Sequence, residues 1–150
     1  MAMEDAARQI DRALTGALKG LAHENAFAGV TSFLRRAYRK DASGADLAVL
    51  GVPFDQAVTH RTGARFGPRA IREASTLQPY DPPWGWPYDP LSELAVADAG
   101  DLAFDYAKVA AFPAALTARI AELLGQGAGT LALGGDHSIT LPILRAYAPA

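Results

Sequence analysis

The stretch Gly129-Thr-Leu-Ala-Leu-Gly-Gly-Asp-His-Ser138 decides the fold that this chain is expected to adopt. Residues 129–133 form an apolar run of strand length, and residues 139–145 have the pattern of a helix start. Two glycines allow a sharp turn between them, so that Asp136 and His137 follow at the carboxyl end of the strand. Ligands bind at that end of open α/β sheets. We therefore predict His137 to be a metal ligand, with a structural His–Asp pair as the alternative.

The rest of the chain repeats this alternation of strand and helix. Residues 46–52 and 94–101 are apolar runs that predict two more strands, and residues 69–75 and 109–124 predict helices. The glycine run at 125–129 stands before a strand, so it indicates a helix stop instead of a phosphate cradle. The order favours a parallel sheet of three strands with helices on both faces.

The first 45 residues predict a helix and an arm that precede this α/β unit. Apolar residues at helical spacing predict an amphipathic helix over residues 4–21 that docks on its own domain or on a second subunit. Residues 23–43 form the arm, and its short basic cluster is expected to be a solvated face. We divide the chain into residues 1–45, helix and arm, and residues 46–150, the first part of the α/β domain.

Composition excludes several classes of protein. The chain has 150 residues, of which 50% are hydrophobic, enough for about one domain. A net charge of −2 with both signs interspersed does not indicate a basic surface that binds nucleic acid. No cysteine is present, so any metal must be held by His, Asp, Glu or water. The amino terminus has no long uncharged run, which argues against a signal peptide or membrane span and predicts a cytoplasmic protein.

Several polar positions at the strand ends leave alternatives open. The loop 54–66 is long and polar, and its His60 is a weak candidate for contact with a substrate. Arg61, Arg65, Arg69 and Arg72 indicate either phosphate binding or ion pairs that tie loop to helix or reach another subunit. Asp98 and Asp101 are candidates for a metal site, but a capping or turn role is favoured for each because Asp beside Gly is common in turns. Ser138 is expected to cap the following helix. The Pro- and Trp-rich loop 77–90 borders a pocket or covers a subunit interface.

Four stretches together resemble the ureohydrolase superfamily, the arginases and agmatinases, and most of all its agmatinase branch. They are Gly51-Val-Pro-Phe-Asp55, residues 61–72 (RTGARFGPRAIR), residues 98–101 (DAGD) and residues 133–141 (LGGDHSITL). Their order and spacing agree with the amino-terminal half of the family over roughly residues 26–148.

The resemblance implies a three-layer α/β/α sandwich, two manganese ions and a homo-oligomer. It implies hydrolysis of a guanidino compound, agmatine first, to urea and an amine by a hydroxide shared between the metals. The histidine matching His137 binds one manganese, and the aspartate matching Asp136 lies beside it. The family's other ligand motifs, Asp-Ala-His-x-Asp and an aspartate cluster, do not occur here. We therefore expect a longer natural chain of about 300 residues. The alternatives are a non-catalytic fragment or paralogue that acts through subunit contacts, and an unrelated nucleotide-binding domain.

Overall fold

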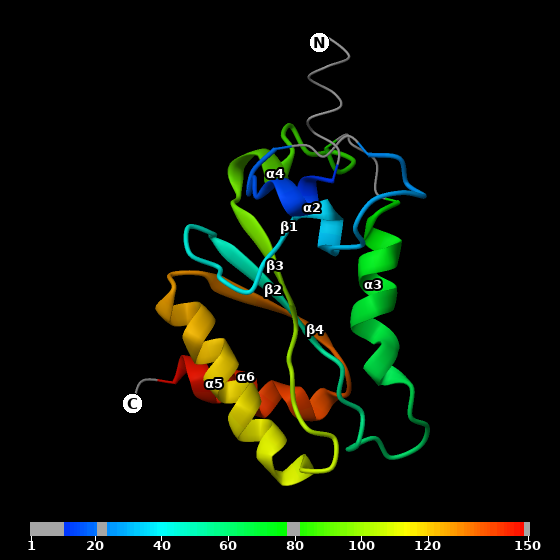
Figure 1. Cartoon of the computed structure of the whole chain (residues 1–150), viewed down its shortest axis with the longest axis vertical. Helices are drawn as coiled ribbons and strands as arrows, with labels where there is room; N and C mark the ends of the chain where they lie inside the picture. Colours follow the sequence, from blue (N-terminus) through cyan, green and yellow to red (C-terminus); the bar gives the residue numbers. More distant parts are fainter. Residues whose placement is uncertain (1–10, 21–23, 78–81, 149–150) are drawn as a thin grey trace.

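The two most apolar runs of the sequence form adjacent parallel strands. In a computed structural model, which describes residues 11–20, 24–77 and 82–148, β2 (Leu47–Val52) pairs with β4 (Gly129–Gly134). On its other side β2 pairs with β3 (Val96–Asp101), and β3 pairs with β1 (Ala37–Tyr38). The sheet order is β1-β3-β2-β4, and every pairing is parallel. The described sheet therefore has four strands, one more than predicted, because the arm contributes β1 (Figure 1).

Helices connect the strands where the sequence predicts them. Pro68 and Pro113 stand in the first turns of α3 (Gly67–Ser75) and α5 (Phe112–Gly125), where a missing N–H costs nothing. The remaining elements are short or terminal: α2 (Arg12–Thr15), α4 (Pro90–Glu93), α6 (Thr140–Tyr147), and the 3-10 turns η1 (Phe33–Arg35), η2 (Ala64–Phe66), η3 (Val109–Ala111) and η4 (His137–Ile139).

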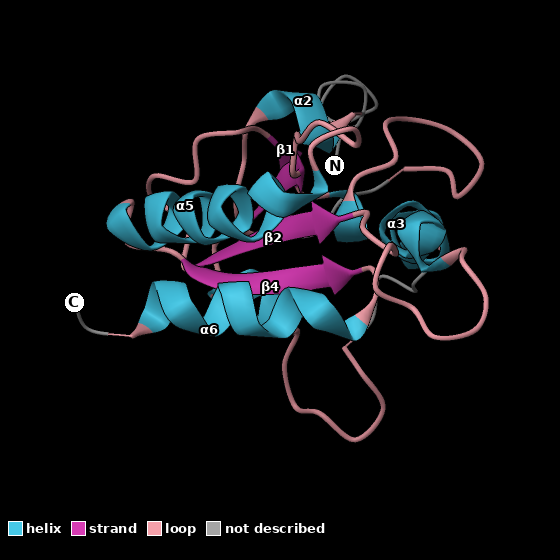
Figure 2. Cartoon of the chain, turned by 90° about the horizontal axis from the view of Figure 1, so that it is seen from below, coloured by secondary structure: helices cyan, strands magenta, loops and turns pink. Residues whose placement is uncertain are grey.

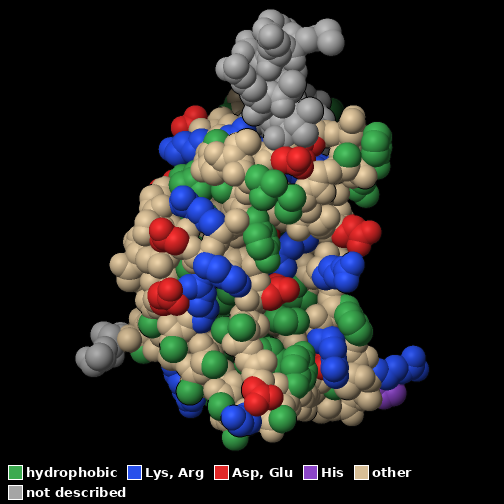
Figure 3. Space-filling view, in the orientation of Figure 1, with side chains coloured by type: hydrophobic (Ala, Val, Ile, Leu, Met, Phe, Trp, Pro, Cys, Tyr) green, Lys and Arg blue, Asp and Glu red, His purple; other side chains and the backbone are tan. Residues whose placement is uncertain are grey.

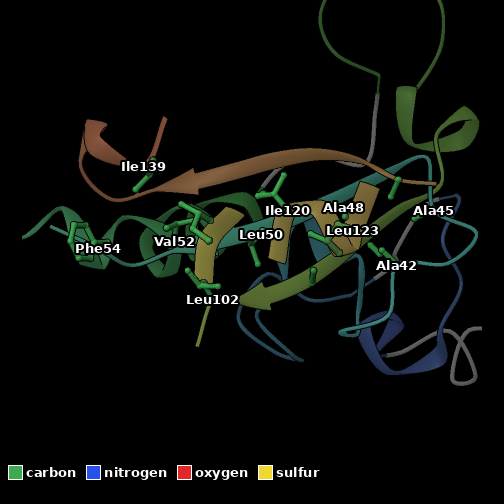
Figure 4. Close-up of a cluster of buried hydrophobic side chains, with 14 of the residues drawn as sticks. Ala42, Ala45, Ala48, Leu50, Val52, Phe54, Leu102, Ile120, Leu123 and Ile139 are labelled. Atoms are coloured by element: carbon green, nitrogen blue, oxygen red, sulfur yellow. The ribbon is translucent and has the colours of Figure 1, made fainter. Parts of the chain in front are cut away.

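The main core lies between the sheet and the helices α5 and α6. Alternate residues of β2, namely Ala48, Leu50 and Val52, join this cluster with Ile120 and Leu123 of α5 (Figure 4). Each of these five residues is fully buried. Burial of a leucine or isoleucine side chain contributes about 1.5–3 kcal/mol, so this face supplies much of the stability. Figure 2 shows α5 and α6 running alongside β2 and β4.

The opposite face of the sheet is covered by α3 and the arm. Asp98 of β3 stands in register with Val49 of β2, on the face away from α5, and Arg72 of α3 reaches it there. Phe33 of the arm and Leu91 of α4 pack against a small buried cluster that contains Val49. Helices thus lie on both faces of a parallel sheet, which confirms the predicted α/β fold class.

The amino-terminal prediction was wrong in length. Residues 4–10 and 21–23 lie outside the described residues, but within 11–20 the helix is limited to Arg12–Thr15. The helix ends there because Gly16 adopts a left-handed conformation, with φ of 79°. The described apolar residues that follow Gly16 at helical spacing therefore do not continue the helix.

The solvated face predicted for the basic cluster was also wrong. Arg35 and Arg36 are 4% and 2% exposed. Arg35 pairs with Glu24 at 2.6 Å, and Arg36 donates to the carbonyls of Leu34 and Gly20 at 2.8 and 2.7 Å. Burial is the main reason that the pKa of Arg36 falls to about 10. These side chains tie the arm together from inside, which local sequence could not reveal.

The outer surface mixes charged and apolar groups. Lysine, arginine and acidic side chains are interspersed over the face shown in Figure 3. Within the part of the 77–90 loop that is described, Trp84 is fully exposed and Trp86 and Tyr88 are about half exposed; residues 78–81 lie outside the description. No helix among the described residues is long and apolar enough to cross a membrane.

Candidate functional site

The turn that carries Asp136 and His137 packs directly on the backbone that follows β2. Gly135 has a φ of 58°, and a Cβ there would lie 2.4 Å from the Val52 carbonyl oxygen and 2.7 Å from that of Phe54. The Asp136 N–H donates to the Phe54 carbonyl at 2.7 Å. Only glycine fits this contact, so the ends of β2 and β4 are held together at the edge where ligands bind.

Asp136 uses both carboxylate oxygens to hold the surrounding backbone. Its Oδ1 accepts from the backbone N–H and the hydroxyl of Ser138 at 2.9 and 2.5 Å. Its Oδ2 accepts from the Ala57 N–H at 2.9 Å, across to the loop that follows β2. Asp136 is therefore the residue that caps η4, and the prediction that Ser138 is the cap was wrong. The serine hydroxyl donates to the cap instead of forming it.

His137 and His60 line the same open cavity. The cavity has a volume of about 490 Å³, and its walls are residues 57–61 on one side and residues 136–138 on the other. The Arg61 Nε–H donates to His60 Nε2 at 3.2 Å. The Nδ1 of His137 lies 3.3 Å from the Thr140 hydroxyl. The fold thus brings together the two histidines that the sequence analysis singled out, and both are exposed to solvent.

The described residues do not supply a complete set of ligands for a metal centre. His137 offers an exposed imidazole to the cavity, but both oxygens of Asp136 already accept hydrogen bonds. Over residues 11–20, 24–77 and 82–148, no three His, Asp or Glu side chains converge to hold a metal. A dimanganese centre does not fit this donor set alone and would need ligands from further residues.

A second carboxylate closes the base of the cavity loop. Asp55 is fully buried, accepts from the Gly63 N–H at 2.6 Å and pairs with Arg65 Nε at 2.7 Å. The hydrogen bond from Arg65 is the main reason that the pKa of Asp55 lies below its ordinary value. The Arg65 guanidinium also lies 5.5 Å from the ring centre of Tyr106. The sequence analysis did not single out Asp55, although its place just after a buried strand was a usable signal.

Asp98 and Asp101 serve an ion pair and not the cavity. Arg72 donates to both oxygens of Asp98, at 2.7 and 2.9 Å, and to Asp101 at 2.6 Å. Burial would lower the pKa of Arg72, but the bonds and charges of the two carboxylates together raise it above the ordinary arginine value. Asp98 also accepts from the Gly100 N–H at 2.9 Å, two residues on, so it combines the predicted turn role with the ion pair. Arg65 and Arg72 both form ion pairs within the chain, but Arg65 pairs inside the loop 54–66 and Arg72 ties α3 to β3, so neither makes the predicted tie from loop to helix.

The comparisons with known proteins agree with this geometry. Residues 45–150 match the arginase family. The chain belongs to the arginase family. An agmatinase of Chromobacterium violaceum is 46% identical over 135 residues, which cover 87% of this chain and 41% of that protein. The chain thus spans less than half the length of this curated relative.

Solved structures place the fold in the same family. A hypothetical agmatinase from Burkholderia thailandensis superposes with a TM-score of 0.87 and 42% identity, over 92% of this chain and 44% of that one. A formiminoglutamase from Trypanosoma cruzi, solved with Mn²⁺, superposes with a TM-score of 0.61 and 25% identity, over 72% of this chain and 36% of that one. These arginase-family relatives confirm the predicted resemblance and the arginase-like α/β fold.

Proposed function

We propose that this chain is the amino-terminal part of a ureohydrolase that hydrolyses agmatine, a guanidino compound, to urea and an amine. The observation that carries the proposal is the 46% identity with an agmatinase over 87% of this chain. The activity is assigned to a longer chain of about 300 residues, because no three His, Asp or Glu side chains among the described residues converge to hold a metal. A cytoplasmic location, homo-oligomeric assembly and a role in polyamine biosynthesis are further parts of the proposal.

The chemistry explains why such a site needs a metal. A guanidinium carbon is a poor electrophile, and manganese, when bound, would supply Lewis-acid activation of water near neutral pH. The structure of the Trypanosoma formiminoglutamase with Mn²⁺ supports manganese as the metal. In this proposal His137 is one ligand, Asp136 orients the turn that bears it, and His60 faces the far end of the substrate from the opposite wall.

The test is manganese-dependent urea release by the complete gene product. Agmatine, 4-guanidinobutyrate and arginine are compared as substrates, since they share the reacting group and differ at the far end. His137→Ala is expected to lower kcat/KM with manganese by about a hundredfold, since loss of a residue that only supports a metal ligand already costs about 10–100-fold. His60→Ala separates substrate binding from metal binding on the opposite wall of the cavity. It is expected to change the preference among the three substrates while manganese dependence stays intact.

Two results would contradict the proposal. Full activity of His137→Ala would remove this residue from the metal site. Absence of urea release by the complete, manganese-loaded protein would instead favour the alternative, a non-catalytic protein that acts through subunit contacts. The exposed Trp84, Trp86 and Tyr88 of the proline-rich loop offer that alternative an apolar surface.

A further inference from the structure

The wall of the cavity opposite His137 is a loop fixed at two points. We define the wall segment as residues 57–61, which line the cavity together with residues 136–138. Beyond the segment, Asp55 binds the Gly63 N–H and Arg65 and so closes the base of the loop. At the start of the segment, the Ala57 N–H donates to Asp136 Oδ2 at 2.9 Å. Between these two points Thr59, His60 and Arg61 are exposed.

The hydrogen bond at Ala57 is accepted by Asp136, the residue next to the proposed metal ligand. Asp136 lies 79 positions away from Ala57 in the chain and is 9% exposed. A hydrogen bond to a charged, largely buried acceptor is among the stronger ones in proteins. The same carboxylate holds the turn of His137 through Ser138. One side chain therefore bonds to both walls of the cavity, in addition to the backbone contacts that join the ends of β2 and β4.

We propose that Asp136 is a positioning residue that holds the wall segment against the His137 turn, and so fixes the space in which the far end of a guanidino substrate binds. This inference rests on the proposed function. Its chemical prediction is specific: loss of the bond to Ala57 releases the wall segment and weakens substrate binding, while His137 keeps its support from the Ser138 side.

The chain contains a matched control for this bond. Asp41 makes the same local turn as Asp136, accepting from the N–H and hydroxyl of the serine two positions on, here Ser43, at 2.9 and 2.6 Å. Asp136 differs by the additional bond from Ala57 to its second oxygen. In Asp136→Asn and Asp41→Asn the remaining carbonyl still accepts from the serine, but an amide NH₂ replaces the second oxygen. At position 136 this NH₂ faces the Ala57 N–H, donor against donor.

Limited trypsin digestion of the complete protein without metal measures the release of the wall segment. Arg61 lies within the segment, and Lys108, exposed in another loop, provides an internal reference for general loosening. Asp136→Asn is expected to raise the ratio of cleavage after Arg61 to cleavage after Lys108 by about tenfold, because a bond to a charged group is lost. Asp41→Asn is expected to leave this ratio unchanged. An unchanged ratio in Asp136→Asn would overturn the proposal.

Kinetics with manganese provide a second readout that a merely structural role would not move. For Asp136→Asn we expect KM for agmatine to rise by about tenfold, kcat to change by less than about threefold, and the manganese requirement to stay the same. A fall in kcat with unchanged KM would overturn the inference while leaving the proposed function in place. An unmodified protein that releases no urea would overturn both, so the two failures are distinguishable.

Discussion

The buried ion pair between α3 and β3 allows the sharpest test of how this fold is held together. Arg72 and Asp98 have side chains that are 6% and 0% exposed, and they share two hydrogen bonds of 2.7 and 2.9 Å. Arg72→Met keeps an unbranched apolar stem but removes the guanidinium and its charge. Asp98 then remains buried, with the N–H groups of Phe33 and Gly100 as its remaining donors.

The expected loss follows from the cost of leaving a buried charge without its partner. Removal of one member of a buried pair destabilises a protein by about 3–5 kcal/mol. The bond to Asp101, whose side chain is 48% exposed, adds little to this. For a chain of this size the loss corresponds to a fall in Tm of about 6–20 °C. Thermal unfolding followed by circular dichroism measures it.

Arg69→Met provides the control, because Arg69 is an exposed arginine on the same helix. Its loss is expected to lower the free energy of unfolding by less than about 0.5 kcal/mol. A double-mutant cycle with Asp98→Asn should give a coupling of at least about 1 kcal/mol between positions 72 and 98. Equal Tm values for Arg72→Met and Arg69→Met would refute the reasoning.

Two further predictions concern the cavity edge. Gly135→Ala should destabilise the chain and expose the turn to hydrogen exchange, because its Cβ would overlap the Val52 carbonyl; native exchange at residues 134–138 would contradict this. The lowered pKa of Asp55 means that its contribution to stability is present above the ordinary aspartate value of about 3.9 and is lost as the pH falls through the folded value. The unfolding free energy of the unsubstituted protein should therefore exceed that of Asp55→Asn near neutral pH, and this difference should shrink below about pH 4. A difference that stays constant with pH would mean that the Asp55–Arg65 pair does not cause the pH dependence.

The sequence predicted well those features that depend on neighbouring residues. The runs at 46–52 and 129–133 became β2 and β4 almost residue for residue. β2 is buried on both faces, which requires continuous apolar side chains, whereas β4 lies at an edge of the described sheet and is only partly buried. The helix predicted at 109–124 was confirmed as η3 and α5. Strand order was also constrained by local information, because short connections with right-handed crossovers leave few arrangements.

The sequence did not predict the burial and bonding of single residues whose partners lie far away in the chain. The Arg35–Arg36 pair looked solvated, yet both side chains are buried and bonded inside the arm. The two-residue strand β1 has no pattern of its own and forms because β3 offers it a free edge. The Asx cap at Asp136 could be placed on the turn from sequence, but its bond to Ala57 depends on how β2 and β4 pair.

The sequence by itself determined the longer strands and helices of the α/β unit, and that Asp136 and His137 follow a strand end, because apolar periodicity and glycine turns act over a few residues. Tertiary structure alone decided which charges are buried and that His60 faces His137 across one cavity. The reason is physical: the free energy of a buried charge or a cavity wall depends on groups that come together only when distant parts of the chain pack.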